Sequence, residues 1–431
     1  MRNGRSIGAV AALATVSLTL AACGNLDSPN SSDSGTGGTT IKVGFVSPIT
    51  GPLAAFGEPD QWVVDQMGAW FKAHPIQAGG KTYQVQIILK DSQSDAKRAA
   101  EVAGELINTD GATVVMAHAT PETTVPVSDQ CEANATPCIT ADTPWQPWFF
   151  GRNGNPAKPF TWTYHFFWGL EDVAAVYSDM WNQVPTNKKV AALFPNDSDG
   201  KAWSDPAKGF PALVKPGGYT IDNPGLFPSG TQDFSAQIAQ FKKNGDEILM
   251  GVLTPPDFAT FWKQAKQQGF RPKIATIGKA AEFPAAAAAL GDLAQNLGTE
   301  VWWSPTYPFS SSLTGKSSAQ LAADYTKATS KQWSMPLGFS EALFEVLQAA
   351  IVKAGGADKQ AIATALKSLS VKTIVGDLDW TKGPVPNVAK SPLTGGQWRT
   401  STGGAFPLEM NIVSNSVAPM VSTVGKASAL Q

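Results

Sequence analysis

Short apolar segments and amphipathic segments alternate along most of the chain. Residues 41–46 form an apolar run typical of a buried strand, and residues 58–73 follow with apolar side chains at helical spacing. The same pairing recurs further along the chain. Additional strands are expected at residues 83–89, 113–117, 137–141, 189–194, 247–253 and 273–277, and additional helices at residues 94–107, 170–184, 233–243, 257–268 and 285–289, with another helix capped by Thr120.

This repetition of β-α units predicts an α/β fold with parallel sheets and helices on both sheet faces. A passage rich in proline, glycine and aromatic residues, 144–168, interrupts the pattern before it restarts. Two runs of units predict two doubly wound lobes. Because ligands bind beyond the carboxyl ends of the strands in open parallel sheets, the expected binding site is the cleft between the lobes.

The N-terminus has the pattern of an export signal. Arg2 and Arg5 precede residues 7–22, which carry no charge and end in small side chains before Cys23. This arrangement predicts a secretory signal peptide over residues 1–22. The apolar run is shorter than the roughly 20 residues that a membrane-spanning helix needs.

The residues around Cys23 resemble the lipobox of bacterial lipoproteins, in which this cysteine takes up lipid and becomes the new N-terminus. Residues 24–40 are rich in Ser, Gly, Asn, Asp and Thr, a composition that does not bury enough apolar area to fold. We therefore expect residues 23–40 to be a lipidated tether, and the protein to be exported and anchored to the outer face of the cell membrane. The alternative is an ordinary signal peptide with an incidental cysteine.

Composition adds two points. The chain has 33 basic and 35 acidic residues without a basic block of the kind that binds DNA or RNA, so no nucleic-acid partner is expected. Tryptophan is unusually frequent, and its large apolar face and single donor suit both cores and ligand pockets. The clustered tryptophans are Trp145, Trp148, Trp162, Trp168, Trp302 and Trp303.

The three cysteines bear on redox state. If Cys23 is lipidated, Cys131 and Cys138 remain, and an exported chain meets an oxidising environment. We therefore expect Cys131 and Cys138 to form a disulfide. Two buried free thiols are the alternative.

The sequence carries no recognisable catalytic motif, with neither H-E-x-x-H, G-x-S-x-G nor a phosphate-binding P-loop. His74, His118 and His165 are its three histidines, and none has metal-ligand spacing to another histidine or to a cysteine. We expect no enzyme, no cofactor and no metal. His118 ends an expected strand, where it either lines the cleft or makes a structural hydrogen bond.

Several stretches resemble the leucine/isoleucine/valine-binding proteins, which are extracytoplasmic solute receptors of ABC importers. The stretches are residues 41–44 (IKVG), 47–53 (SPITGPL), 56–58 (FGE), 90–95 (KDSQSD) and 376–380 (GDLDW). The resemblance implies two lobes joined by three crossing segments, which close on a bound solute. It assigns residues 41–165 plus 300–380 to lobe I and residues 166–299 plus 381–431 to lobe II.

The resemblance also implies ligand-binding positions on loops that face the cleft. In the family, the helix start after the third strand grips the ligand, and the free N–H groups of such a helix end suit a carboxylate. The positions in lobe I are Phe56, Thr120, Glu122, Asp142, Thr143 and Trp145, and those in lobe II are Asp199, Thr254, Lys279 and Glu282.

One position departs from the family pattern. Amino-acid binders of the family use an acid to pair with the ligand ammonium, and that position holds Ala280 here, beside Lys279. A cation opposite the aromatic side chains of Phe56 and Trp145 suits a hydrophobic or aromatic acid or amide better than leucine.

The resemblance implies a monomer that presents its closed form to ABC permease subunits. Two other functions stay open on the sequence. One is a ligand-sensing receptor on the same fold that signals instead of feeding a permease. The other is an enzyme, such as a surface hydrolase that uses Asp142 or Glu282.

Overall fold

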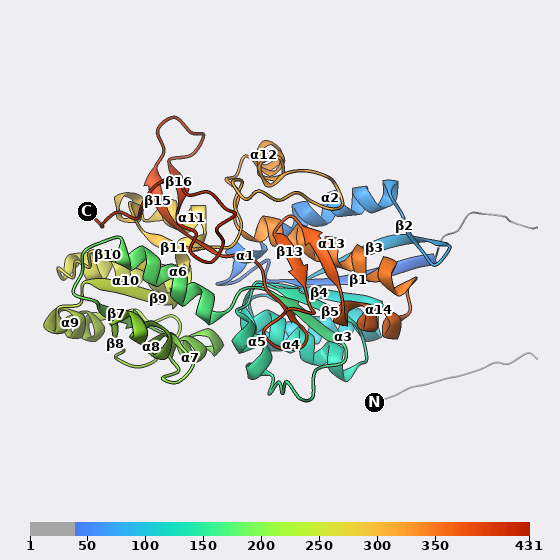
Figure 1. The fold of residues 1–431 in the computed structure, drawn as a ribbon, viewed down its shortest axis with the longest axis horizontal. Coiled ribbons are helices and arrows are strands. Elements are labelled where there is room, and N and C mark those ends of the chain that lie inside the picture. The colour runs from blue at the N-terminus through green and yellow to red at the C-terminus, as the bar shows by residue number, and fades with distance from the viewer. Residues whose placement is uncertain (1–38) are drawn as a thin grey trace, which may run out of the picture. The chain divides into compact units, whose positions relative to one another are not determined.

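The computed structural model describes residues 39–431 and contains two seven-stranded sheets and a two-stranded hairpin (Figure 1). The first sheet has the order β14 (Val388–Ala389), β6 (Thr163–Phe166), β5 (Cys138–Ala141), β4 (Val114–Ala117), β1 (Thr39–Ser47), β3 (Lys81–Asp91) and β2 (Ile76–Ala78). Only β2 pairs antiparallel there. The hairpin is β12 (Ser370–Thr373) with β13 (Gly376–Asp379).

The second sheet is also mainly parallel. Its order is β16 (Leu408–Ser414), β15 (Thr394–Thr400), β11 (Gly298–Val301), β10 (Ile274–Lys279), β9 (Ile248–Leu253), β7 (Lys189–Leu193) and β8 (Thr220–Asp222). Only β15 and β16 run antiparallel to their neighbours. The predicted fold class of two α/β lobes with parallel sheets is confirmed.

Helices connect the strands of each lobe. The first lobe has α1 (Ala54–Gly57), α2 (Asp60–Ala73), α3 (Ala96–Asn108), α4 (Thr120–Ala133), α5 (Trp145–Gly151), α12 (Ser318–Thr329), α13 (Pro336–Ala354) and α14 (Lys359–Lys367). The second lobe has α6 (Leu170–Asn182), α7 (Ser198–Ser204), α8 (Phe210–Val214), α9 (Ser235–Asn244), α10 (Pro255–Gln267) and α11 (Pro284–Ala289), with 3-10 turns η1 (Lys215–Gly217), η2 (Ala280–Glu282) and η3 (Gly291–Ala294).

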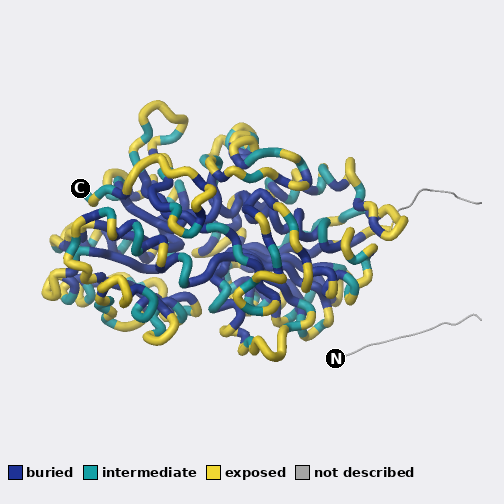
Figure 2. Tube along the Cα trace, in the orientation of Figure 1, coloured by how far each residue is buried: buried dark blue, intermediate teal, exposed yellow. Residues whose placement is uncertain are grey.

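Alternate residues of each parallel strand face opposite helical layers, because strand side chains have a period of two. In β1, Val43 and Phe45 pack on the side of α2 and α13, whereas Val46 packs on the side of α3 and α4. In β9, Ile248 packs on the side of α6 and α8, and Leu249 on the side of α9 and α10. The central strands of both sheets are therefore buried on both faces, in agreement with the dark segments inside the molecule in Figure 2.

Three segments carry the chain between the sheets, after β6, after β11 and after β14. The third was expected near residue 380, but it lies between Ala389 and Thr394. The reason is that Val388 and Ala389 are buried and pair with His165 and Phe166, which adds a seventh strand to the first sheet. Residues 381–389 therefore belong to the first lobe.

The N-terminal boundary also differs from the expectation. Strand β1 begins at Thr39, which pairs with Tyr83 of β3, so the last two residues of the expected tether are part of the sheet. The expected signal peptide, Cys23 and the rest of the tether lie outside the described residues. Within the described part, the structure joins Cys131 of α4 to Cys138 of β5 by a disulfide.

Candidate ligand-binding site

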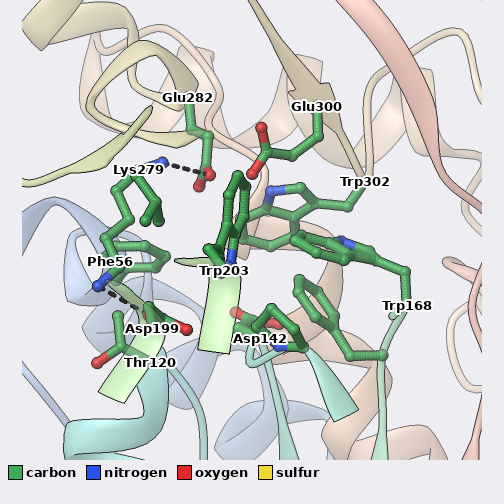
Figure 3. A pocket seen from close by; sticks show the side chains of 13 residues that line it. Phe56, Thr120, Asp142, Trp168, Asp199, Trp203, Lys279, Glu282, Glu300 and Trp302 are labelled. Carbon is green, nitrogen blue, oxygen red and sulfur yellow. Dashed lines mark hydrogen bonds and ion pairs between the residues drawn. The ribbon is translucent and has the colours of Figure 1, made fainter. Parts of the chain in front are cut away.

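A buried cavity lies where the carboxyl ends of strands from both sheets meet (Figure 3). The first lobe contributes Phe56, Thr120, Asp142 and Pro144, the crossing segments contribute Phe167, Trp168 and Trp302, and the second lobe contributes Asp199, Trp203, Val252, Lys279, Glu282 and Glu300. The space open to the centre of a water molecule is about 20 Å³, which holds about one water. A larger solute therefore requires the lobes or the lining side chains to move.

The backbone turns sharply where strands end at the cavity. Ala119 and Thr120 follow β4, Asp142 follows β5 and Lys279 ends β10, and all four have φ between 59° and 72°. Non-glycine residues rarely adopt this left-handed region, and such conformations cluster at functional sites. These turns place three of the four side chains in the cavity lining.

Thr120 was expected to cap helix α4, but the structure assigns it a different place. The helix already includes Thr120, and its N-cap is Ala119, whose side chain makes no capping bond. The positive φ values at Ala119 and Thr120 show that the backbone turns sharply at this helix start, directly before Pro121. Within residues 39–431 its hydroxyl is buried without a hydrogen-bond partner.

Aromatic rings form much of the cavity wall. Phe56 meets Phe283 of the second lobe edge to face at 4.7 Å, and Phe167 meets Trp302 in the same manner at 5.3 Å. The indole N–H groups of three lining residues have no acceptor within residues 39–431. These residues are Trp168, Trp203 and Trp302, and each is at most 3% exposed.

His118 lies behind the cavity and connects two carboxylates. Its Nε2–H donates to Asp60 at 2.5 Å and its Nδ1–H donates to Asp142 at 2.7 Å, and all three side chains are fully buried. Burial by itself lowers the pKa of His118, but the charges and hydrogen bonds of Asp60 and Asp142 raise it to about 10. The imidazole is therefore charged at neutral pH.

Asp142 joins this buried group to the cavity. Burial raises the pKa of Asp142 to about 6, and the adjacent His118 opposes the rise. One carboxylate oxygen, Oδ2, accepts from His118. The other, Oδ1, is buried without a partner in the described part of the chain.

Lys279 lies in a second group of charges. Its Nζ is 2.7 Å from Oδ2 of Asp199 and 3.3 Å from Oδ2 of Asp197, and the residue is 5% exposed. Burial favours the neutral amine, but Asp199 and Asp197 raise the pKa of Lys279 well above its usual value. In this structure Lys279 does not offer a free cation, because Asp197 at the N-cap of α7 and Asp199 within α7 already pair with it.

A pair of buried glutamates completes the lining. Burial, and next the charge of Glu300, raises the pKa of Glu282 well above its usual value. Burial also raises the pKa of Glu300, which accepts hydrogen bonds from Tyr177 and, at 3.1 Å, from Thr299. Adjacent carboxyl groups in a dry site do not ionise together readily, so this pair retains a proton.

The structure distributes the sequence-predicted residues over three places. Phe56, Thr120, Asp142, Asp199, Lys279 and Glu282 line the central cavity, whereas Glu122 and Thr254 line an adjoining hollow of about 260 Å³ that also reaches Lys279. Thr143 and Trp145 line neither of these. Thr143 bonds to Thr124, and Trp145 donates to Glu171.

Sequence reasoning missed seven lining residues, which are Pro144, Phe167, Trp168, Trp203, Val252, Glu300 and Trp302. Trp168 and Trp302 belong to tryptophan clusters that the sequence displays, and both lie on segments that cross between lobes. Glu300 carries another readable signal, because it is an acid inside the short, fully buried strand β11.

Two further findings concern membrane spans and metal sites. Over residues 39–431, no helix has both the length and the apolar character required to traverse a bilayer. The same residues contain no group of three or more histidine, cysteine, aspartate or glutamate side chains that is placed to hold a metal ion.

Two α/β lobes that enclose a cavity with aromatic walls and buried polar groups, at the carboxyl ends of their strands, define a bilobal solute-binding protein. The chain belongs to the periplasmic binding protein family, whose family model matches residues 40–403. Its sequence is similar to Leu/Ile/Val-binding proteins of other bacteria. This is a family of binding proteins and not of enzymes.

Individual relatives agree with this family. A Leu/Ile/Val-binding protein homologue of Brucella melitensis is 27% identical over 48% of this chain, and the match spans about half of the relative, 53%. An amino acid binding protein of Pseudomonas aeruginosa is 25% identical over 79% of this chain and 86% of the relative. The crystal structure of a leucine-binding protein from Thermotoga maritima has a TM-score of 0.69 and 18% identity, covering 87% of this chain and 99% of that chain.

Proposed function

We propose that this protein is the lipid-anchored solute-binding component of an ABC importer, and that it captures an amino acid or a related small amide by lobe closure. The observation that carries the proposal is the set of unpartnered polar atoms in the buried cavity. Buried polar groups are almost always hydrogen-bonded, so such a set in one place points to a missing partner. The atoms belong to Thr120, Asp142, Trp168, Asp199, Trp203 and Trp302.

These atoms specify the chemistry of the solute. Three indole N–H groups require acceptors, whereas the free oxygens of Asp142 and Asp199 require donors. The aromatic wall accommodates an apolar body. A solute with both donors and acceptors, such as an amino acid or an amide, meets these requirements better than a simple hydrophobic acid, for which Lys279 is no longer available as a counterion.

Contacts between the lobes support closure as the capture step. Phe56 of the first lobe packs on Phe283 of the second, and Lys208 of the second lobe lies 4.8 Å from the ring of Phe150 in the first. With these contacts formed, the cavity is buried and small. A solute that binds both walls would favour this arrangement over an open one through its differential affinity.

Mass spectrometry of small molecules released by denaturing the purified protein tests the solute assignment. We expect one compound that carries both N–H donors and acceptor oxygens. Trp302→Phe keeps the aromatic wall but removes one donor, so this variant should release less of the compound. Absence of any released compound, together with no rise in melting temperature in a panel of amino acids and amides, would contradict the proposal.

The anchor has its own test. Cys23→Ala should be shed from cells into the medium, because the acylated cysteine is the expected membrane attachment. Cys138→Ala serves as a control that removes a cysteine from the folded body. Retention of the Cys23→Ala protein in the membrane fraction would show that Cys23 is not the anchor.

A further inference from the structure

A hydrogen-bonded chain runs from the core of the first lobe to the cavity. Asp60 of α2 accepts from Ser340 of α13 at 2.5 Å and also from Ser47 of β1, and it receives the Nε2–H of His118. The Nδ1–H of His118 then reaches Asp142. Residues of α2, α13 and β1, together with His118 directly after β4, thereby fix one oxygen of Asp142. Its other oxygen is buried without a partner within residues 39–431, and Asp142 lines the cavity.

We propose that Asp142 selects solutes that carry an ammonium group, and that His118 is the positioning residue that holds Asp142 for this contact. The inference rests on the proposed function, since it concerns the solute cavity. The family resemblance gave Asp142 no role in charge recognition. The position that aligns with the family's ammonium-binding acid holds Ala280 in this chain.

The charges around Asp142 support a cationic partner. On its own lobe it faces the His118 imidazolium, which is shared with Asp60, so this buried group has one excess negative charge when all three are ionised. The groups that line the opposite wall are Asp199, Glu282, Glu300 and Lys279, of which Lys279 is the only cation. Asp199 and Asp197 already offset Lys279. An ammonium group would balance the excess, whereas a carboxylate would add to it.

The aromatic residues of the cavity fit the same partner. Phe56, Phe167, Trp168, Trp203 and Trp302 line the space into which Asp142 projects (Figure 3). Aromatic faces attract cations through their quadrupoles, and cages of such rings bind ammonium groups in other proteins. The combination of aromatic walls with one unpartnered carboxylate oxygen therefore suits an ammonium attached to an apolar body.

Matched probes test the selectivity of Asp142 by calorimetry at pH 7.5. Leucine, 3-methylbutylamine and 4-methylpentanoate share one apolar body and differ in their charged groups, and phenylalanine, 2-phenylethylamine and 3-phenylpropanoate form a second set. We expect both amine-bearing members of at least one set to bind the wild-type protein at least tenfold more tightly than the acid. Asp142→Asn should weaken amine binding by roughly 10–150-fold and leave acid binding unchanged or stronger.

The control is Asp95→Asn, which removes the same charge from the same lobe. Asp95 caps α3 by accepting from the backbone N–H of Arg98, and asparagine caps helices equally well. This variant should retain wild-type amine affinity. Thermal unfolding of both variants separates lost binding from lost folding.

The pH dependence distinguishes positioning by His118 from a merely structural role. Amine affinity of the wild-type protein should fall as the pH drops through about 6, where Asp142 takes up a proton. His118→Gln removes the adjacent positive charge, so the pKa of Asp142 should rise and the midpoint should shift to higher pH. A variant that is weaker by the same factor at every pH would overturn the role of His118.

The outcomes separate this inference from the proposed function. Tighter binding of the acids than the amines, equal loss of acid and amine affinity in Asp142→Asn, or no binding of any amine probe would each overturn the selectivity of Asp142. The proposed function would survive all three if the purified protein still releases a bound amide or other solute on denaturation.

Discussion

Replacing Lys279 by methionine tests the physical account of the cavity most directly. Methionine has a similar length but no charge, so the variant would leave Asp199 buried without its counterion. The side chains of Lys279 and Asp199 are 6% and 3% exposed and their charged atoms are 2.7 Å apart. Removing one partner from a buried pair typically costs about 3–5 kcal/mol, because the remaining charge has lost most of its hydration.

A matched control lies near the other end of the same strand. Lys273 pairs with Glu247 at 2.9 Å, but these side chains are 48% and 29% exposed. Solvent screens such pairs, so Lys273→Met should cost about 0–1 kcal/mol. Urea unfolding followed by tryptophan fluorescence measures both losses, and equal m-values are needed for a direct comparison.

The pKa of Asp199 determines how the loss of unfolding free energy in Lys279→Met changes with pH. Burial raises the pKa of Asp199 to about 7 even beside Lys279, far above its value of about 3.9 in an unfolded chain. Protonation therefore favours the folded state as the pH falls through about 7, and the pKa should be higher still in Lys279→Met. The loss should shrink between pH 8 and pH 5, and Asp199→Asn should restore stability to the variant at pH 8. A loss no larger than that of Lys273→Met, or one independent of pH, would refute this reasoning.

Two further predictions concern the backbone and the disulfide. A Cβ added at Gly278 would lie 2.7 Å from Glu300, so Gly278→Ala should lower solute affinity, measured by calorimetry, at least tenfold. Gly68→Ala is the control, because a Cβ there meets no atom within 4 Å, and it should not change the affinity. Unchanged affinity in Gly278→Ala would disprove the effect. Thiol labelling of the denatured, unreduced protein should find neither Cys131 nor Cys138 free, and Cys131→Ser with Cys138→Ser should cost about 2 kcal/mol in urea unfolding. Full labelling of both thiols would rule out the bond.

The fold could be predicted because its signals are local. Strand and helix periods recur in short windows, and Asp95 caps α3 as its position before the helix indicates. The two-residue strand β14 could not be predicted in this way. Val388 and Ala389 have no periodicity to read, and they form a strand only because β6 offers an unpaired edge.

The site was less accessible because charges acquire their meaning from distant neighbours. The sequence does not indicate a partner for Lys279, yet Asp197 and Asp199 reach it from the start of α7, about eighty residues earlier in the chain. The link from His118 to Asp60 and Asp142 likewise joins three separate elements. Residue types and loop positions indicated which side chains lie near the cleft, but their pairing depends on the packed fold.

The position of Trp168 and Trp302 has a consequence for how solute binding could change the angle between the lobes. Both indoles line the cavity, and both lie on segments that cross between the lobes, so any change in the angle between the lobes would pivot at these segments. A solute in contact with Trp168 and Trp302 would touch the pivot directly. Binding of the solute would then be coupled to the angle between the lobes without a change in the interior of either lobe. Because indole emission responds to the polarity of its surroundings, the chain also carries an optical reporter of that angle at its hinge.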